Sequence, residues 1–357
     1  MNNQHDELNK LGWNDWFEQR AACKPTDTIA RVAAVDRDQL LLVDQAGHFR
    51  AKLSGSFLHH HQHVSQELPC VGDWVYVEKQ SGDDFGVVHA LIERRTSLRR
   101  KSAGTRIEHQ MIAANLDYVV IVQSCQFDFN LNRLERYLVM VSEGRAEPVI
   151  LLTKTDLVDP GVLAAQLAEI ASASISTPIL PLSNVTRDGL DRLKGLLLPG
   201  KTYCFVGSSG VGKSTLINQL IGRQRLETGV VSGTGEGRHT TVRRELIRLE
   251  GGALVIDNPG MREFGILGAD GGIGGSYSGI SALASACRYR NCGHTDEPGC
   301  AVLAAVQAGE ISPESLENFH KLRKESDFND MSYAEKRKKD RDFGKYIKSV
   351  KKDLRKG

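Results

Sequence analysis

The sequence has no long hydrophobic run. No stretch of its 357 residues approaches the roughly 20 consecutive apolar residues that a bilayer-spanning helix needs, so we expect neither a membrane segment nor a membrane partner. The first residues also lack the basic-then-apolar order of a secretion signal, which predicts a cytoplasmic protein. With 40% hydrophobic and 25% charged residues, a chain of this length is expected to form about two to three domains with buried cores.

The sequence also lacks the cysteine pattern of a disulfide framework. Its seven cysteines are an odd number, and four of them lie singly at residues 23, 70, 125 and 204. The other three lie between residues 287 and 300. Because a framework needs paired cysteines at regular spacings, we expect reduced thiols and one metal site.

The net charge is only +2, yet basic residues are concentrated in two places. Residues 321–357 contain 14 Lys or Arg against 7 Asp or Glu, and residues 94–101 contain several Arg or Lys and no acid. Such runs suit a polyanion such as RNA, although each is also compatible with a solvated face or a hinge. Two runs at opposite edges of a domain favour polyanion binding.

Residues 28–93 alternate short β-branched stretches with turn residues. The expected strands cover residues 29–32, 40–43, 49–53, 71–77 and 86–92. A small barrel of about five strands is typical of an OB-fold, although an SH3-like barrel would have a similar pattern. Residues 59–63 include four histidines in what the pattern indicates is a polar loop. Adjacent histidines cannot all converge on one ion, so we interpret them as solvated rather than as a metal site.

From Asp117 the pattern changes to apolar runs that alternate with helical periods. This alternation is typical of βαβ units around a parallel sheet. The expected strands cover residues 118–122, 149–152, 179–182, 204–206, 246–249 and 254–256, and the expected helices cover about 131–144, 160–173, 188–198 and 213–222. Residues 265–279 contain seven glycines and are predicted to form a flexible connector.

A glycine-rich turn at residues 207–214, with the sequence GSSGVGKS, has the pattern of a phosphate loop. It follows an apolar strand and opens a helix, which is the context that this motif requires. Its glycines let backbone N–H groups surround phosphates, Lys213 reaches the β and γ oxygens, and Ser214 ligates Mg²⁺. The predicted nucleotide-binding residues here are Gly207, Ser208, Ser209, Gly210, Val211, Gly212, Lys213, Ser214 and Thr215.

The tetrapeptide Thr153, Lys154, Thr155 and Asp156 ends another apolar strand. The Asp156 carboxylate can accept both N1–H and the exocyclic amine of guanine, a donor pair that adenine lacks. We expect Ser183, at the end of the next strand, to add a backbone contact to the guanine oxygen. Ordinary GTPases place the phosphate loop before this tetrapeptide. The reversed order predicts a circularly permuted GTPase domain.

Two further segments are predicted to sense the γ-phosphate. Asp257 follows an apolar strand and would hold Mg²⁺ through water, while the N–H of Gly260 would contact the γ-phosphate. Upstream, residues 237–241 form a loop suited to ordering when nucleotide binds. There Thr241, rather than Thr240, would close on Mg²⁺.

The residue that orients the attacking water cannot be the usual glutamine in this sequence, so we predict another one. Many GTPases place glutamine directly after the glycine of the γ-phosphate segment to orient the attacking water, but Met261 stands there and cannot do so. His239 is our candidate for that role, and the alternative is a histidine that only stabilises its loop. With Lys213 and Thr241 it makes up the predicted catalytic set. We expect slow intrinsic hydrolysis that a partner accelerates by ordering the loop.

Three cysteines and one histidine lie within 14 residues near the C-terminus. Cys287, Cys292, His294 and Cys300 form a closed set for tetrahedral Zn²⁺, with no position left for a reactive water. We therefore predict one structural zinc ion, the alternative being reduced cysteines around a histidine. Ser312 and Pro313 indicate a helix start, and a basic helix from about residue 332 is expected to lie on a partner.

Taken together, these motifs resemble the ribosome small-subunit-dependent GTPases of the RsgA or YjeQ type. The resemblance covers about residues 28–325, and the most specific strings are residues 207–215, 237–241, 257–264, 287–294 and 297–302. It implies a multidomain protein with an N-terminal OB-fold β-barrel, a central, circularly permuted α/β P-loop GTPase domain and a C-terminal helical zinc-binding domain. It also implies GTP hydrolysis stimulated by the small ribosomal subunit, contact with its rRNA and a role in late subunit maturation.

We accordingly predict four segments. They are an N-terminal extension (1–27), the OB-fold (28–104), the GTPase domain (105–267) and the zinc-binding domain with a basic C-terminal helix (268–357). The extension carries Trp13 and Trp16 in an expected amphipathic helix.

The expected ligands are GTP or GDP with Mg²⁺, and the expected state is a monomer. Because the γ-phosphate segment precedes the connector at 265–279, we expect nucleotide state to reach the zinc domain through it. Two alternatives stay open. An rRNA-binding assembly factor with a degenerate, non-hydrolysing nucleotide site would explain Met261 and Thr153, which stands where the family usually has asparagine. An adenine-nucleotide enzyme is the other.

Overall fold

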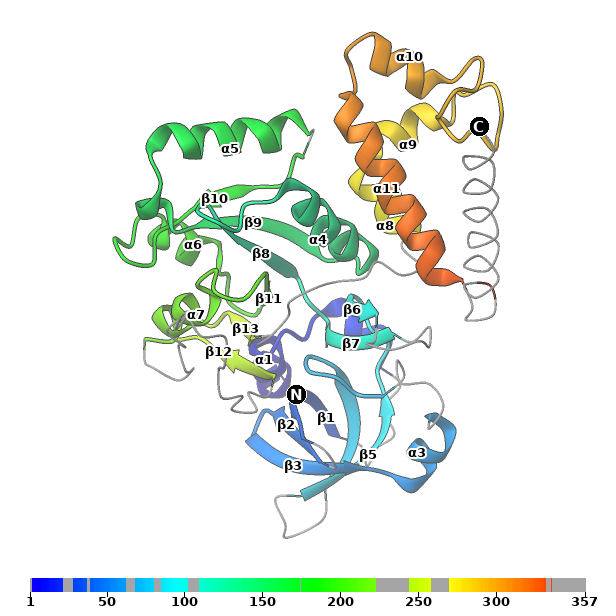
Figure 1. The fold of residues 1–357 in the computed structure, drawn as a ribbon. Helices are drawn as coiled ribbons and strands as arrows, with labels where there is room; N and C mark the ends of the chain where they lie inside the picture. Colours follow the sequence, from blue (N-terminus) through cyan, green and yellow to red (C-terminus); the bar gives the residue numbers. More distant parts are fainter. Residues whose placement is uncertain are drawn as a thin grey trace, which may run out of the picture.

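The structure is a computed structural model, and it describes residues 2–21, 28–36, 39–61, 68–79, 85–101, 109–173, 175–222, 244–257, 270–331 and 335. Figure 1 shows a β-barrel, a central sheet flanked by helices, and a group of C-terminal helices beside the central domain. The predicted multidomain architecture is confirmed.

The N-terminal barrel closes through five strands. They are β1 (Thr28–Val35), β2 (Leu40–Asp44), β3 (Gly47–Leu53), β4 (Trp74–Lys79) and β5 (Phe85–Leu91). Pairing runs β1–β2–β3–β5–β4 and returns from β4 to β1, with only β3–β5 parallel. This is the OB-like barrel that we expected. Alternating side chains, among them Val32, Leu42 and Val88, fill its interior.

The predicted polar histidine loop is wrong for residues 59–61, because these residues end helix α3 (Gly55–His61). The buried ring of Phe57 anchors the helix, and its backbone N–H bonds to Ser54 Oγ at 3.1 Å. Packing of the Phe57 ring therefore favours a helix here, although the polar composition of the segment indicated a loop. His63 lies outside the described residues.

The central sheet follows the predicted α/β pattern. Its parallel strands are β8 (Tyr118–Ser124), β9 (Glu147–Thr153), β10 (Ile179–Pro181), β11 (Thr202–Val206) and β13 (Leu254–Asp257), with β12 (Glu245–Arg248) antiparallel. The spatial order is β10-β9-β8-β11-β13-β12. The chain thus builds one half of the sheet before it crosses to β11, on the other side of β8. This strand order is the one that a circularly permuted domain requires.

Helices cover both faces of this sheet (Figure 1). They are α4 (Leu131–Glu143), α5 (Pro160–Ser172), α6 (Leu190–Leu196) and α7 (Lys213–Ile221). Successive residues of each strand enter opposite cores, as the two-residue period of a strand requires: Val119 and Ile121 pack with α4, while Val120 and Val122 pack with α6 and α7. The strands are therefore apolar on both faces, which explains their continuous hydrophobic runs.

Two pairings join the barrel to the central domain. A hairpin of β6 (Ser97–Lys101) and β7 (His109–Ala114) spans the position of the predicted boundary near residue 104. In addition, Ala34 of β1 pairs with Glu245 of β12, so that the barrel strands and the central strands form one continuous eleven-stranded sheet. The exact domain boundary stays a prediction.

The N-terminal segment forms two short helices, α1 (Asn2–Lys10) and α2 (Asp15–Glu18). Trp13 lies between them and is buried, with its ring centroid 4.9 Å from that of Trp74 on the barrel and 5.5 Å from that of Phe17. The expectation that Trp13 and Trp16 share one amphipathic helix is wrong. The segment packs against the barrel through stacked and edge-on aromatic rings.

The C-terminal module consists of α8 (Asp270–Ser276), α9 (Ser278–Ala284), α10 (Ala301–Gln307) and α11 (Pro313–Asp330). The flexible connector predicted at 265–279 is therefore wrong for its described part. Glycines 272 and 275 of α8 face α4, where an added Cβ would lie 2.4 Å from Val139 O and 2.4 Å from Ser142 Oγ respectively. Close helix packing offsets the low helix propensity of glycine.

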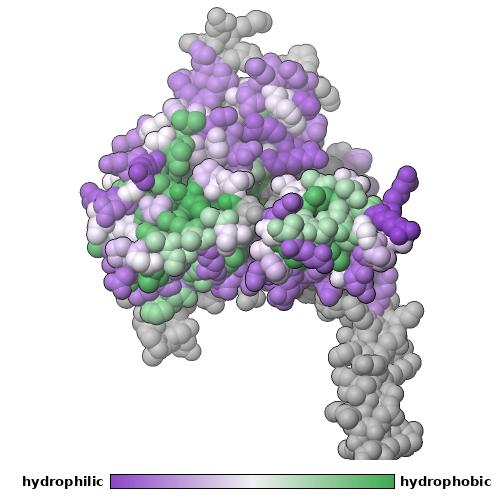
Figure 2. Space-filling model, turned by 90° about the horizontal axis from the view of Figure 1, so that it is seen from above, coloured by the Kyte–Doolittle hydropathy of each residue, from purple (hydrophilic) through white to green (hydrophobic). Residues whose placement is uncertain are grey.

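Seen from above, the molecule shows two hydrophobic areas where α5 and α10 face the viewer (Figure 2). On α5 the side chain of Val162 is exposed and only Ile170 is buried. Among the described residues, no helix combines the length and the apolar character that crossing a membrane requires.

Candidate functional site

The predicted nucleotide-binding residues gather at one edge of the central sheet. Strands β9, β11 and β13 end at Thr153, Val206 and Asp257, and Ser183 follows the end of β10. Because these strands are parallel, their carboxyl ends share one edge, where open α/β sheets bind ligands. The tetrapeptide predicted to read the base and the predicted phosphate loop meet there: Thr153 Oγ1 donates a hydrogen bond to Val211 O at 2.7 Å.

The phosphate loop has a backbone that suits glycine at three positions. Gly207, Gly210 and Gly212 have φ values of +146°, +80° and +98°. An added Cβ at Gly207 would lie 2.2 Å from Val122 O, and one at Gly212 would lie 2.6 Å from Asn184 Nδ2. Both the conformation and the space therefore require glycine. Helix α7 begins directly afterwards, so its N-terminal N–H groups open toward the same edge.

Lys213 is buried within this loop. Its Nζ donates to Gly207 O at 2.8 Å and to Ser208 O at 2.5 Å. Burial lowers the pKa of Lys213 to about 8, and the carboxylates of Asp257 and Asp128 oppose that shift. The ammonium form therefore still predominates at neutral pH. Phosphate oxygens are stronger acceptors than these carbonyls because they carry charge.

On the base side of the site, Ser183 contributes in a way that the sequence did not predict. Its hydroxyl donates to Asp156 Oδ1 at 2.5 Å and accepts the N–H groups of Val185 and Thr186, each at 3.1 Å, while the expected backbone contact to guanine stays a prediction. Ser183 thus orients the exposed carboxylate of Asp156. Lys154 has a left-handed backbone with φ of +59°, which turns the chain sharply between β9 and a short 3-10 helix (Thr155–Leu157).

Thr153 is buried and links the two predicted loops. Its hydroxyl lies 2.7 Å from Val211 O and 3.1 Å from Gln123 O. A hydroxyl has one proton to donate, so the two carbonyls share it. The departure from the family's usual asparagine therefore keeps a hydrogen-bonding tie between the base side and the phosphate side of the site.

Sequence-based prediction did not identify two other contacts with the phosphate loop. Asn184 Nδ2 donates to Gly212 O at 3.1 Å, and Gln219 of α7 in turn donates to Asn184 O at 2.7 Å. Arg133 of α4 donates to Ser208 Oγ at 2.7 Å. The position of Asn184, directly after Ser183 at a strand end, could have indicated its contact. No sequence pattern indicates the contact of Arg133, because Arg133 lies 75 residues from its partner.

Several predicted site residues lie outside the described ranges. They are His239, Thr240, Thr241, Gly260 and Met261. The basic helix expected from residue 332 also lies outside, apart from residue 335.

The basic run at residues 94–101 differs from our expectation of a polyanion-binding face. Arg94 forms a bidentate pair with the buried Asp73, with both N–O distances at 2.7 Å. Arg95 pairs with Asp117 at 2.6 Å, and Arg99 Nη2 lies 2.9 Å from the Glu143 carboxylate. These three cations are therefore largely neutralised at the junction between the barrel and the central domain.

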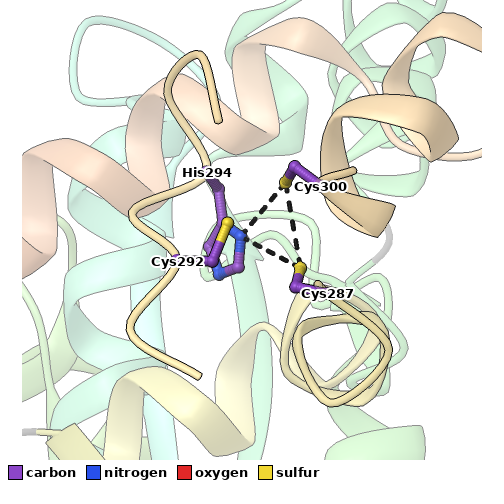
Figure 3. Close-up of side chains that lie close together, drawn as sticks. All are labelled: Cys287, Cys292, His294 and Cys300. Atoms are coloured by element: carbon purple, nitrogen blue, oxygen red, sulfur yellow. Dashed lines mark hydrogen bonds between the residues drawn. The ribbon is translucent and has the colours of Figure 1, made fainter. Parts of the chain in front are cut away.

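The predicted zinc ligands converge between the end of α9 and the start of α10 (Figure 3). One ligand atom from each of Cys287, Cys292, His294 and Cys300 lies within 4.8 Å of the others. Cys287 Sγ lies 3.8 Å from Cys300 Sγ and 3.6 Å from His294 Nδ1. A tetrahedral ion with Zn–S bonds of about 2.3 Å would set its sulfurs about 3.8 Å apart, so the residues fit zinc.

The loop that carries His294 is also held by hydrogen bonds within the protein. Glu297 accepts backbone N–H groups from Gly293 at 2.6 Å and Thr295 at 2.9 Å, and these bonds lower the pKa of Glu297 to about 2. Burial lowers the pKa of His294, which keeps its imidazole neutral. A neutral imidazole is the form that binds a metal.

Comparison with known proteins places this architecture among characterised ones. The family model of the RsgA GTPases matches residues 91–267. The chain is 39% identical over 360 residues to "Small ribosomal subunit biogenesis GTPase RsgA 2" of Vibrio parahaemolyticus, covering 98% of this chain and 94% of the relative.

Two crystal structures share the fold. YjeQ from Thermotoga maritima has a TM-score of 0.62 at 25% identity, covering 83% of this chain and 97% of that one. YloQ, described as a circularly permuted GTPase, has a TM-score of 0.61 at 23% identity, covering 86% of this chain and 97% of that one.

Proposed function

Because the chain belongs to the RsgA GTPase family, we propose that it hydrolyses GTP to GDP and assists the late maturation of the small ribosomal subunit. The relative from Vibrio parahaemolyticus, named for small-subunit biogenesis, aligns over nearly the whole of both chains. The observation that carries the proposal is the 2.7 Å contact between Thr153 Oγ1 and Val211 O. It brings the base-reading and phosphate-binding loops to one site.

In the proposed site, each group has a chemical task. Asp156, oriented by Ser183, accepts the two donors of guanine. The glycine-lined loop surrounds the phosphates, and Lys213 exchanges its bonds to loop carbonyls for bonds to phosphate oxygens. Ser214 and Asp257 would hold Mg²⁺, which would neutralise charge that develops on the phosphates during hydrolysis. Burial strengthens these electrostatic contacts because water screens them less.

The hydrolytic step is proposed from the sequence pattern. Thr241 would close on Mg²⁺ and His239 would orient the attacking water, in place of the glutamine that Met261 replaces. A neutral imidazole can hydrogen-bond water, which is the basis for this role. The expected consequence is slow turnover that binding to the small subunit accelerates.

The flanking modules are proposed to contact rRNA. The barrel has the OB-like architecture that often binds nucleic acid, and the chain beyond residue 321 is rich in Lys and Arg. One Zn²⁺ bound by Cys287, Cys292, His294 and Cys300 would stabilise the C-terminal module without taking part in hydrolysis. We also propose a cytoplasmic, monomeric protein; the six described cysteines form no disulfide bonds, which fits a reducing compartment.

GTP turnover with and without purified small ribosomal subunits tests the proposal. We expect low turnover alone and a clear increase when subunits are added. Lys213→Ala should abolish both, because it removes the cation that binds the phosphates. Binding of subunits without turnover in either condition would instead support the non-hydrolysing assembly factor.

A substitution at Asp156 tests whether this residue recognises guanine. Asp156→Asn replaces an acceptor by a donor, so we expect weaker GTP binding and stronger binding of xanthosine triphosphate, whose base carries an oxygen in place of the amine. Asp159→Asn is the matched control, because this nearby side chain makes no capping bond at α5. Unchanged preference in Asp156→Asn would remove Asp156 from the base site.

A further inference from the structure

The first turn of α4 faces the outer side of the phosphate loop. Arg133 Nη1 donates to Ser208 Oγ at 2.7 Å, and the same nitrogen contacts the carboxylate of Asp128. The Arg133 side chain is 37% exposed and that of Asp128 is 22% exposed, so the group lies at the edge of the site rather than in open solvent.

The backbone that carries Arg133 is anchored to the sheet. Asn130 caps α4, and its side chain accepts the N–H of Arg133 at 2.8 Å. The buried side chain of Gln123 at the end of β8 exchanges bonds with the backbone of Asn130, at 3.1 Å and 3.3 Å. Arg133 therefore starts from a fixed position. Its reach to Ser208 is set by the sheet and the helix cap.

Ser208 connects Arg133 to the phosphate-binding lysine. Its hydroxyl accepts from Arg133, while its carbonyl accepts from Lys213 Nζ at 2.5 Å. When phosphate draws Lys213 away from that carbonyl, the loop loses an internal bond. The bond from Arg133 to the side chain of Ser208 is unaffected by that exchange, so it can hold the loop in shape throughout.

We propose that Arg133 is a positioning residue of the phosphate loop, which holds Ser208 from outside so that the loop stays preorganised for phosphate. The proposal rests on the proposed nucleotide site. Asp128 already pairs with Arg133 and satisfies its charge. Direct contact with a phosphate would require Arg133 to leave this partner, which favours positioning over phosphate binding.

Nucleotide affinities of the full-length chain test this role. A positioning residue acts on ground-state binding of both nucleotides, because each uses the same loop. For Arg133→Ala we expect the Kd values of GDP and of GTP to rise by the same factor, about three- to tenfold, as for loss of one typical hydrogen bond. The Kd values of Arg133→Lys should lie between those of the wild type and of Arg133→Ala, since one ammonium cannot reproduce the fork geometry of the guanidinium.

Arg136→Ala is the matched control on the same helix. Arg136 pairs with Glu325 of α11 at 2.7 Å and has no contact with the loop among the described residues, so both Kd values should stay at the wild-type level. Thermal melting of each variant shows whether it is folded. Unchanged Kd values in Arg133→Ala, or a loss confined to GTP, would overturn the proposal, the latter because it indicates contact with the γ-phosphate.

A double-mutant cycle isolates the route through Ser208 and does not depend on the stability of one variant. If Arg133 acts through the hydroxyl of Ser208, then Arg133→Ala should have no further effect on Kd in the Ser208→Ala background. Independent, additive effects would overturn the proposal. If the wild-type chain bound neither nucleotide, that result would instead contradict the proposed function, and the role of Arg133 would fall with it.

Discussion

At the junction between the barrel and the central domain, buried arginines bridge the two modules, whereas at the junction with the C-terminal module two glycines let helices touch. Arg31 is 1% exposed and represents the first kind of junction. Its guanidinium donates to Gly72 O, Leu11 O, Asn115 O and Thr202 Oγ1. One side chain thus ties the N-terminal segment, the barrel and the central sheet.

The electrostatics of Arg31 explain why the junction between the barrel and the central domain requires satisfied hydrogen bonds. Burial lowers the pKa of Arg31 to about 10, although the carboxylates of Asp117 and Asp73 oppose the shift. A buried cation is tolerated only when its donors are satisfied. Here they are satisfied by acceptors from three segments, so the relative position of those segments is closely defined.

The other junction depends on shape. Gly272 and Gly275 bring α8 onto α4, and Gly272 N donates to Glu143 Oε2 at 2.9 Å. The ion pair between Arg136 and Glu325 is partly exposed, and such pairs stabilise little. The comparison teaches that the barrel side is sensitive to lost hydrogen bonds, whereas the zinc side is sensitive to added volume.

The largest expected contrast between the junctions comes from metal removal. A strong chelator, or Cys300→Ser, should unfold the C-terminal module, because binding of a structural Zn²⁺ contributes on the order of 10 kcal/mol to such sites. The barrel and the central sheet should keep their melting transition. Elemental analysis and calorimetry check this, with Cys125→Ser as the control, since that thiol lies far from the cluster along the chain and is buried under α5.

Loss of the buried guanidinium should have the next largest effect. Arg31→Met removes a donor from the carbonyls of Leu11, Gly72 and Asn115, of which Gly72 O keeps the amide of Asn115 at 3.2 Å. We expect a loss of about 2–4 kcal/mol in the free energy of unfolding. Urea denaturation of the full chain measures it. Arg50→Met is the control, because the Arg50 side chain is 59% exposed and pairs only at the surface. Similar losses in the two variants would contradict the bridging role of Arg31.

The smallest expected effect tests added volume on the zinc side. Gly272→Ala places a Cβ within contact of Val139 O, and we expect a destabilisation of about 1–3 kcal/mol from overpacking. Gly279→Ala in α9 meets nothing within 4 Å and should instead stabilise by up to about 1 kcal/mol, because alanine favours the helix. Thermal melting compares them, and equal shifts would argue against the glycine contact.

Much of the fold followed from local pattern. The helices predicted at 131–144 and 160–173 match α4 and α5 within one residue at either end, because a cap or a proline marks their starts. The glycine content of residues 265–279 was misleading, since composition reports intrinsic flexibility while packing on α4 selects the helix. Likewise the pairing of Arg94 with Asp73 joins residues 21 apart, which charge counting along the chain does not detect.

In the candidate site, too, some parts were predictable from local sequence and others were not. The phosphate loop and the Cys–His cluster were recognisable because all their groups lie within a few residues of one another, so the spacing alone constrains their geometry. The hydroxyl contacts of Ser183 with Asp156 and of Thr153 with Val211, and the reach of Arg133 to Ser208, cross 27 to 75 residues. Such contacts depend on which strands become neighbours.

By itself, the amino-acid sequence determined which chemical groups this protein offers: a glycine-lined turn suited to phosphate, a carboxylate suited to guanine, and four side chains that fit one metal ion. Only the tertiary structure decided how these parts are held together, through Arg31 between the modules, the glycines of α8 on α4, and Thr153 between the two loops. The physical reason is that hydrogen bonds and close packing act over a few ångströms in space, and strand order sets which distant segments come that close.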